Sequence, residues 1–286
     1  MSQARLLITC TDRPGIVAAV SGFLTQYHGN ITALDQHTTD PDRGLFFMRV
    51  AFEMPGTEPP GNWLQTEFRQ EVAEPFGMDW HLAFAARHKR MAILVSKPDH
   101  ALLELLWRWS RGELPARIAG VISNHPENQD AVETFGLPFH YIPVKQGAQA
   151  EAEEAMLEQL AAWGVELVVL ARYMRILSPE FVDRYPSRII NIHHSFLPAF
   201  AGSDPYRQAF DRGVKLIGAT AHYATSELDA GPVIEQDVIR VSHRDGVADL
   251  RERGREVERS VLARAVRWHL EDRIAVWGNR TVVFGT

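Results

Sequence analysis

Short apolar runs alternate with amphipathic segments from residue 91 to residue 170, and this alternation constrains the fold more than any other feature. Met91–Val95 is apolar throughout, as in a strand buried on both faces, and the helical spacing of Asp99–Arg111 follows it. The expected sequence then continues with a strand at Ile118–Ile122, a helix at Gln129–Phe135, a strand at Phe139–Ile142, a helix at Ala148–Trp163 and a strand at Val165–Leu170. Such alternation predicts a doubly wound, mostly parallel α/β sheet that binds ligands beyond the carboxyl ends of its strands.

The first 85 residues carry a different pattern. Strands are expected at Arg5–Cys10, Ile31–Thr39, Leu45–Phe52 and Met78–Phe84, with helices from Ile16 and over Trp63–Val72, and a hairpin loop at residues 40–44. This βαββαβ order is the ferredoxin-like arrangement. The polar joint AARHKR at residues 85–90 marks the boundary, so we predict two domains, residues 1–85 and residues 86–286. A helix over Arg255–Leu270 and an extended segment over Thr281–Phe284 are expected to end the second.

Composition narrows the class of protein. Of the 286 residues, 45% are hydrophobic and 23% charged, as in a soluble globular protein, and no apolar run reaches the roughly 20 residues that span a bilayer. The N-terminus lacks a signal-peptide pattern and Cys10 is the only cysteine, so we expect a cytoplasmic protein. Residues 1–85 hold 5 Lys and Arg against 10 Asp and Glu, and the other 201 residues sum to −1. Neither part has the basic excess of a nucleic-acid binder.

Polar side chains follow two apolar runs in the second half of the chain. Ile189-Ile190 leads into Asn191 and His193, and Ile217–His222 is followed by Asp229. If both runs are strands, these side chains meet beside one cleft. An amide that donates to an oxyanion, an imidazole that moves a proton and a carboxylate that orients water or the imidazole suit acyl chemistry.

Four motifs in this region, NIHHSFLPAF, PY of GSDPYRQAF, GATAHY and LDAGPVIEQD, resemble the folate-dependent formyltransferase family, and the resemblance covers nearly the whole chain. Within that family they are most similar to members that hydrolyse 10-formyltetrahydrofolate. The resemblance implies a hydrolase that releases tetrahydrofolate and formate, balances one-carbon folate pools and supplies formate for purine synthesis. It assigns catalysis to Asn191, His193 and Asp229, with either His193 or Asp229 as general base. The alternatives are a formyltransferase acting on an amine and a sensor on a degenerate catalytic fold.

The histidines and Ser195 permit other interpretations. Neighbouring residues of a strand point to opposite sides, so His193 and His194 are not expected to share a metal, and no cysteine pair or HExxH motif supports one. We expect His194 and His222 to be structural. Ser195 lacks the GxSxG context of a nucleophile and is expected to cap a turn. Asp229 on its own is equally consistent with a turn residue.

A second implied binding element follows the fourth strand of the α/β domain. The segment ARYMRILS at residues 171–178 resembles the family segment that holds the pterin ring, largely through backbone groups. The implied folate-binding residues are Arg172, Tyr173, Met174, Arg175, Ile176 and Leu177. Met174, Ile176 and Leu177 would supply apolar walls. The alternative is a plain connection to a helix that starts after Ser178.

The loop Ser96-Lys97-Pro98-Asp99-His100 contains no glycine. Relatives that formylate a phosphoribosyl amine have a glycine-rich loop here whose backbone N–H groups bind the phosphate. Pro98 has no N–H and Asp99 repels phosphate, so a phosphorylated acceptor is disfavoured. Ser203-Asp204 departs from the family pattern, which leaves open how that loop meets the substrate.

The turn DRPGIV at residues 12–17 resembles the ACT family of small-molecule-sensing domains. The resemblance implies an amino-acid effector bound where two copies meet, in a homo-oligomer, either a dimer or a tetramer. The alternative is a domain that only mediates oligomerisation. No metal and no cofactor beyond the folate substrate are expected.

Overall fold

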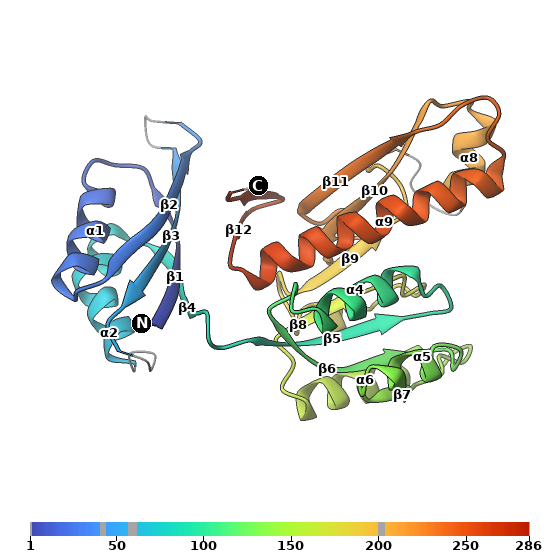
Figure 1. Ribbon diagram of the computed structural model, residues 1–286, viewed down its shortest axis with the longest axis horizontal. Helices are drawn as coiled ribbons and strands as arrows, with labels where there is room; N and C mark the ends of the chain where they lie inside the picture. The colour runs from blue at the N-terminus through green and yellow to red at the C-terminus, as the bar shows by residue number, and fades with distance from the viewer. Residues whose placement is uncertain (1, 41–43, 57–61, 200–203, 286) are drawn as a thin grey trace. The chain divides into compact units, whose positions relative to one another are not determined.

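The computed structural model describes residues 2–40, 44–56, 62–199 and 204–285 of the chain (Figure 1). These form two compact units, one built mainly from residues 1–88 and the other from residues 89–270 and 278–281. Residues 41–43 of the expected hairpin loop lie outside the described residues, as does Ser203.

The first unit is a four-stranded antiparallel sheet in the order β2-β3-β1-β4. Its elements are β1 (Ser2–Thr11), α1 (Ile16–Gln26), β2 (Asn30–Thr38), β3 (Leu45–Met54), α2 (Trp63–Phe68), a π-helical turn (Arg69–Ala73), α3 (Glu74–Phe76) and β4 (Asp79–Phe84). Alternate residues of β1 are buried, and its buried side, which includes Leu6 and Ile8, packs in one core with Val20 and Phe23 of α1. The predicted ferredoxin-like βαββαβ order is confirmed.

The end of the chain belongs to this first unit, contrary to the predicted assignment of residues 86–286 to one domain. Residues 271–277 and 282–286 group with it. Ala275 and Phe284 bury themselves in a cluster with Phe47 of β3, and Arg49 donates to the backbone oxygen of Asp272 at 2.8 Å. The two strands concerned are β12 (Ile274–Trp277) and β13 (Arg280–Val283). Periodicity along a sequence cannot reveal such a long-range return.

The second unit contains a seven-stranded sheet in the order β11-β10-β9-β8-β5-β6-β7. Its strands are β5 (Lys89–Val95), β6 (Ala116–Ser123), β7 (Phe139–Tyr141), β8 (Leu167–Leu170), β9 (Ile189–His193), β10 (Leu216–Tyr223) and β11 (Val233–Arg240). Its helices are α4 (His100–Ser110), α5 (Gln129–Thr134), α6 (Gln149–Ala162), α7 (Pro179–Val182), α8 (Pro205–Asp211) and α9 (Val247–Leu270).

Helices cover both faces of this sheet, and every residue of the central strand β8 is therefore buried. Helix α6 packs Met156 and Leu160 against Ala92 and Leu94 of β5 in one cluster, whereas α9 runs along β9, β10 and β11 beside α4 (Figure 1). The strands from β7 through β9 pair in parallel, so the predicted mostly parallel α/β sheet is confirmed.

Three features of the second unit were not predicted from the sequence. Strand β10 pairs antiparallel with both β9 and β11, although its apolar run resembles that of a parallel strand. Helix α9 begins at Val247, two turns before the expected start at Arg255. The first half of the helix buries few residues, among them Leu250 and Gly254, so its apolar periodicity is weak. Helix α8 was not predicted.

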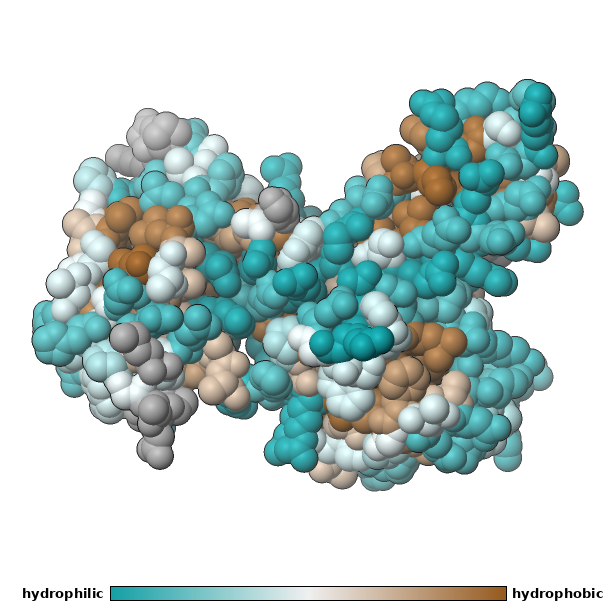
Figure 2. Space-filling view, viewed as in Figure 1, coloured by the Kyte–Doolittle hydropathy of each residue, from teal (hydrophilic) through white to brown (hydrophobic). Residues whose placement is uncertain are grey.

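The visible surface is largely hydrophilic, with hydrophobic residues in separate patches (Figure 2). Among the described residues, none of the helices combines the length and apolar character needed to cross a membrane.

Candidate active site

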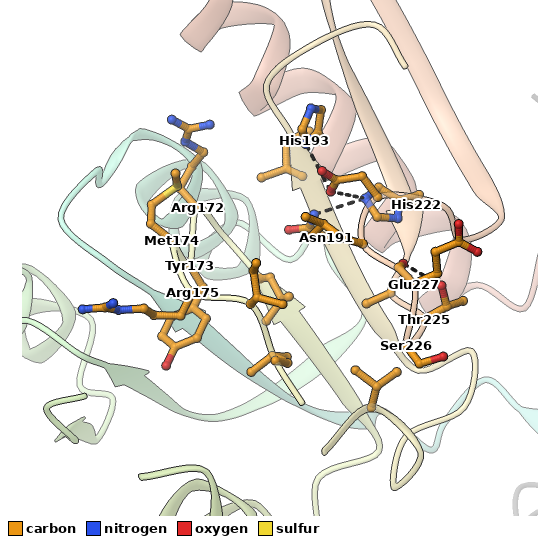
Figure 3. Close-up of a pocket in the computed structure, with 18 of the residues that line it drawn as sticks. Arg172, Tyr173, Met174, Arg175, Asn191, His193, His222, Thr225, Ser226 and Glu227 are labelled. Carbon is orange, nitrogen blue, oxygen red and sulfur yellow. Dashed lines mark hydrogen bonds and ion pairs between the residues drawn. The ribbon is translucent and has the colours of Figure 1, made fainter. Parts of the chain in front are cut away.

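The antiparallel pairing of β9 with β10 brings three polar side chains together. His222 lies opposite Asn191 in the register, and Thr220 lies opposite His193. His193 and His222 are buried, and Asn191 is half-buried. The Asn191 Nδ2 and His222 Nε2 atoms are 3.1 Å apart (Figure 3). The antiparallel strand β10 therefore supplies the side chain, His222, that positions the Asn191 amide.

Asp229 reaches this cluster from the turn between β10 and β11. Its Oδ1 lies 3.2 Å from His193 Nδ1 and 3.7 Å from His222 Nε2. The hydrogen bond from His193, followed by the interaction with His222, holds the pKa of Asp229 well below its usual range. Asp229 has a φ of 53°, a left-handed conformation that aspartate and asparagine tolerate better than most residues. The three residues predicted as catalytic thus lie within one hydrogen-bonded group.

Hydrogen bonding determines which ring nitrogen of each histidine carries a proton. His222 Nδ1 lies 3.0 Å from the carbonyl oxygen of Tyr223, which can only accept, so this nitrogen donates. Nε2 of neutral His222 then accepts from the Asn191 amide, which orients the Asn191 NH₂ group. The ionised Asp229 likewise accepts from Nδ1 of His193.

His193 Nε2 is buried and has no hydrogen-bond partner within the described part of the protein. Buried polar atoms are nearly always paired, so an unpaired ring nitrogen beside an ionised aspartate indicates a group that meets a ligand. With Nδ1 bonded to Asp229, neutral His193 offers the lone pair of Nε2 for accepting a proton. An aspartate that orients a histidine in this way is a general-base arrangement.

These side chains line one wall of a cavity of about 360 Å³. The opposite wall is the segment that follows β8: Arg172, Tyr173, Met174 and Arg175 lie across the cavity from the cluster, with the side chains of Tyr173 and Arg175 pointing away from it (Figure 3). The cavity is lined by Leu170, Arg172–Leu177, Val182, Asn191–His194, His222 and Ala224–Asp229. The structure therefore brings all six predicted folate-binding residues and all three predicted catalytic residues to one site.

Of the three side chains predicted to form apolar walls, Met174 and Ile176 are exposed and Leu177 is buried. Met174 and Ile176 are 52% and 63% exposed, so a bound ring could cover them. Tyr173 and Leu177 are largely buried, and the Tyr173 hydroxyl reaches the sulfur of Met156. The segment thus anchors itself with the side chains of Tyr173 and Leu177 and leaves the residues between them exposed.

Buried polar groups hold this segment at both ends. At its start, Ser96 Oγ accepts the Met174 N–H at 2.9 Å and donates to Asn124 at 2.7 Å. At its end, the buried Glu153 accepts the Ser178 N–H at 3.1 Å. Gln149 connects the two sides, donating to Glu153 and to the Ile176 carbonyl, both at 2.8 Å. These contacts fix a backbone that belongs to no helix or strand.

His194 was expected to be structural. It lines the cavity as well, and its ring lies 6.0 Å from that of Tyr206. Burial, followed by the nearby Arg172 charge, lowers the pKa of His194 to about 4. It is therefore neutral at physiological pH. Within the described residues, no three His, Cys, Asp or Glu side chains are placed to hold a metal ion together.

Residues of the glycine-free loop after β5 form hydrogen bonds and ion pairs with other parts of the second unit. Ser96 holds the 172–177 segment, Lys97 pairs with Glu127 at 3.1 Å, and His100 lies 2.8 Å from the buried Glu258. Asp204, the described half of the Ser203-Asp204 departure, pairs with Arg251 at 3.1 Å. Ser195 Oγ donates to the Ala199 carbonyl, as expected for a turn residue.

The sequence matches the ACT domain profile over residues 4–56 and the Formyl transferase profile over residues 89–266. A formyltetrahydrofolate deformylase from Bacillus subtilis (strain 168) is 54% identical over 282 residues, which cover 99% of this chain and 94% of that protein. The chain belongs to the formyltetrahydrofolate deformylase family. Both resemblances noted in the sequence, to the formyltransferase fold and to ACT domains, are confirmed.

Solved structures agree with this family. A formyltetrahydrofolate deformylase from Pseudomonas syringae pv. tomato superposes with a TM-score of 0.96 at 46% identity, covering 100% of this chain and 95% of that one. Glycinamide ribonucleotide transformylase 1 from Symbiobacterium toebii matches at a TM-score of 0.67 and 33% identity over 72% of this chain and 98% of its own. The deformylases thus match the whole chain, including the first unit.

Sequence reasoning missed several residues that build this deformylase-family site. His222 was expected to be structural, yet it contacts both Asn191 and Asp229. Ser96 was considered only for its failure to bind phosphate, and Glu153 was not considered. The signal for His222 was present in the sequence, since it ends the apolar run Ile217–His222. Nothing in the sequence links Ser96 or Glu153 to a segment so far along the chain.

Proposed function

We propose that this protein hydrolyses 10-formyltetrahydrofolate to tetrahydrofolate and formate. The observation that carries the proposal is the cluster of Asn191, His193 and ionised Asp229, in which the buried His193 Nε2 has no protein partner at the edge of the cavity. The arrangement suits addition of water to an amide carbon, because it offers one base and one oxyanion donor together.

In the first step, a water molecule adds to the formyl carbon. Neutral His193 accepts the water proton at Nε2 while its Nδ1–H remains bonded to Asp229. Asp229 is the weaker candidate for the base, because its depressed pKa makes it a poor proton acceptor at neutral pH. It holds the ring in the required tautomer and stabilises the imidazolium that forms. These contacts support His193 as the base, a role that the sequence left open between His193 and Asp229.

The carbonyl oxygen becomes an oxyanion as the water adds. Asn191 donates one amide hydrogen to His222, which leaves the second for the oxyanion. A preorganised donor of this kind is worth about 3 kcal/mol of barrier. In this scheme His222 carries its proton on Nδ1, which donates to the Tyr223 carbonyl, and its Nε2 accepts from Asn191.

In the second step, the tetrahedral intermediate collapses. The carbon–nitrogen bond to N10 breaks, and the His193 imidazolium returns its proton to N10, so tetrahydrofolate leaves with an N–H group. The carbon departs as formic acid, which ionises to formate in water. His193 ends neutral, ready for the next turnover.

We further propose that Arg172–Leu177 hold the pterin ring largely through backbone groups. Support comes from the way Ser96 and Glu153 fix this non-helical segment and from the exposure of Met174 and Ile176 along the cavity. A planar heterocycle fits between an apolar side and a row of backbone donors and acceptors.

The test is formate release from purified protein and 10-formyltetrahydrofolate with no other substrate. We expect one formate for each formyl group consumed, unchanged by added glycinamide ribonucleotide. A formylated product that accumulates as fast as formate would contradict hydrolysis and favour transfer. The pairing of Lys97 with Glu127 and the use of Ser96 in the 172–177 segment support the first outcome, because both side chains already have partners within the protein.

We propose that the first unit binds an amino-acid effector where two subunits meet, in a dimer or tetramer. An open hollow of about 650 Å³ lies around the start of α1, lined by residues 12–18, 36–38 and 46. Gly15, at a φ of 97°, precedes the helix, whose N-terminus favours a carboxylate.

Light scattering would give the subunit number. Thermal shift and activity across the twenty amino acids test the effector, and no response to any of them would leave only an oligomerisation role.

The chain's own residues supply each proton transfer and the oxyanion donor in this scheme, so we propose no cofactor beyond the folate substrate. The single, buried Cys10 supports a proposed cytoplasmic location, where thiols stay reduced.

A further inference from the structure

A buried carboxylate stands beside the site without a part in the mechanism. Glu258 of α9 is only 1% exposed and receives three polar side chains from elsewhere in the second unit. Tyr206 donates to it at 2.6 Å, His100 lies 2.8 Å away and Arg172 Nε lies 3.4 Å away. These residues come from the start of α8, the start of α4 and the loop after β8.

Stability does not explain this arrangement. Burial alone would raise the pKa of Glu258, but His100, Arg172 and Tyr206 together lower it, so the carboxylate stays charged. Buried ion pairs recover little more than their desolvation cost, and apolar replacements are often as stable. Arg172 also adopts a φ of 65°, which glycine adopts freely and arginine does not. The network therefore calls for a functional explanation.

Gly254, one turn before Glu258, is shaped for the same network. A Cβ atom at this position would lie 2.0 Å from the Tyr206 hydroxyl oxygen. Any other residue would displace the hydroxyl that donates to Glu258. The helix thus leaves space for Tyr206 at the point where its carboxylate binds it.

The network borders a second, smaller space of about 140 Å³ that opens to solvent past Asp204 and Arg251, here called the Glu258 chamber. Its described lining consists of Pro98, His100, Arg172, His194, Asp204, Pro205, Tyr206, Arg251, Arg255 and Glu258. Arg172 and His194 also line the folate cavity, so they form the partition between the two spaces. The ring centroids of His194 and His193 are 5.3 Å apart, so the chamber adjoins the residue that activates water in the proposed reaction.

The chamber is small and its partition is polar. Its volume has room for a few waters, each occupying about 30 Å³ in the liquid. It lies well below the roughly 300 Å³ of the smallest pockets that hold drug-sized molecules. The buried Nη1 of Arg172 has no hydrogen-bond partner among the described residues and can donate to water.

We propose that Arg172, held in place by Glu258, is a specificity-determining residue that limits the nucleophile at the formyl carbon to the size of water. This inference rests on the proposed hydrolysis and adds to it the reason why an amine does not compete. With the guanidinium fixed across the partition, an amine carrying further groups has no space behind the carbon it would attack.

The test measures how the formyl group divides between water and added amines. Purified enzyme turns over 10-formyltetrahydrofolate with hydroxylamine or with the larger glycinamide, and mass spectrometry gives the ratio of formylated amine to formate against an enzyme-free blank. Because the readout is a ratio, it does not depend on the total rate. Formate release by the wild type without amine tests the proposed hydrolysis separately.

The main variant is Arg172→Gly, since glycine fits the φ of 65° and removes the side chain from the partition. We expect the wild type to formylate hydroxylamine but not glycinamide, and Arg172→Gly to raise the glycinamide ratio about tenfold or more. Glu258→Gln keeps the size of the side chain but loses the charge that holds Arg172, so it should raise the ratio less. Arg175→Ala is the matched control, because Arg175 lines the folate cavity but not the chamber, and its ratio should equal that of the wild type.

Three results would overturn the proposal. One is a wild-type enzyme that formylates glycinamide as readily as it releases formate. Another is an unchanged glycinamide ratio in Arg172→Gly and Glu258→Gln. The third is failure of hydroxylamine to be formylated by any of these enzymes, because exclusion would then not depend on the size of the amine.

Discussion

The two walls of the folate cavity are built in opposite ways. On the β9–β10 wall, side chains fix one another: His193 bonds Asp229, and His222 bonds Asn191. On the 172–177 wall, the backbone is held from behind by buried groups, while Met174 and Ile176 remain exposed. A single replacement should therefore act directly on the chemical step at the first wall. At the second wall, replacements of the supporting residues should act on substrate binding.

The strongest test of this contrast is Asp229→Asn. Asparagine fills the same space and tolerates the φ of 53°, but it no longer holds the Nδ1–H of His193 as a charged acceptor. An equivalent change in a serine protease lowers kcat by about 10⁴. We expect a loss of about 10³-fold or more in kcat, with folate affinity and fold retained. Steady-state kinetics, fluorescence titration with folate and circular dichroism measure the three quantities. Retention of more than about a tenth of the rate, a difference below 1.4 kcal/mol, would remove Asp229 from the mechanism.

The next largest effect is expected for Asn191→Ala. This change removes the proposed oxyanion donor and should lower kcat by about 10²- to 10³-fold with little change in KM. His222 would lose its hydrogen bond to Asn191, so stability should be measured by thermal unfolding in parallel. An effect confined to KM would place Asn191 in substrate binding and erase the difference between the walls.

Ser96→Ala should affect the other wall. It removes the acceptor of the part-buried Met174 N–H, at a cost of about 0.5–1.5 kcal/mol. We expect KM for 10-formyltetrahydrofolate to rise about tenfold, with a smaller change in kcat. Ser123→Ala is a matched control: this buried serine ends the neighbouring strand β6 and accepts the His125 N–H, away from the 172–177 segment. The same rise in KM in both variants would point to general destabilisation.

The smallest effect concerns His194, where the two walls meet. Burial beside Arg172 lowers its pKa to about 4 from 6.5, so between these pH values the unfolded chain binds the proton and the folded protein does not. Stability therefore falls as pH drops from 6.5 to 4, with a slope of up to about 1.4 kcal/mol per pH unit. Urea unfolding from pH 7 to pH 4.5 should show a shallower acid loss for His194→Asn than for the wild type. Identical pH profiles would contradict a neutral, half-buried His194.

The sequence revealed the first wall better than the second for a physical reason. Asn191 and His193 follow a buried apolar run, and a polar residue at that place has few explanations besides a site. Resemblance to known motifs then supplied Asp229. The supports of the second wall, Ser96 and Glu153, are ordinary polar residues whose partners lie 78 and 25 positions further along the chain. Only the folded topology brings them together.

The sequence likewise does not reveal the direction of strand β10 or the burial of the charged Glu258. The apolar run of β10 does not show that the strand is antiparallel, yet this direction sets His222 against Asn191. Glu258 lies in a stretch of alternating charges that reads as a solvated helix face, and its burial depends on Tyr206 and Arg172. Hydrophobic periodicity predicts which elements form, but not which polar residue is buried between them.

The return of the chain's end to the first unit has a consequence for biosynthesis. Ribosomes add about 5–20 residues per second, so the first 88 residues emerge well before the last 16. Until Ala275 and Phe284 have been made, Phe47 lacks two of the buried side chains that surround it, and Arg49 lacks its acceptor on Asp272. A nascent chain stalled before residue 271 should therefore expose this patch to chaperones. The unit that is synthesised first is completed last.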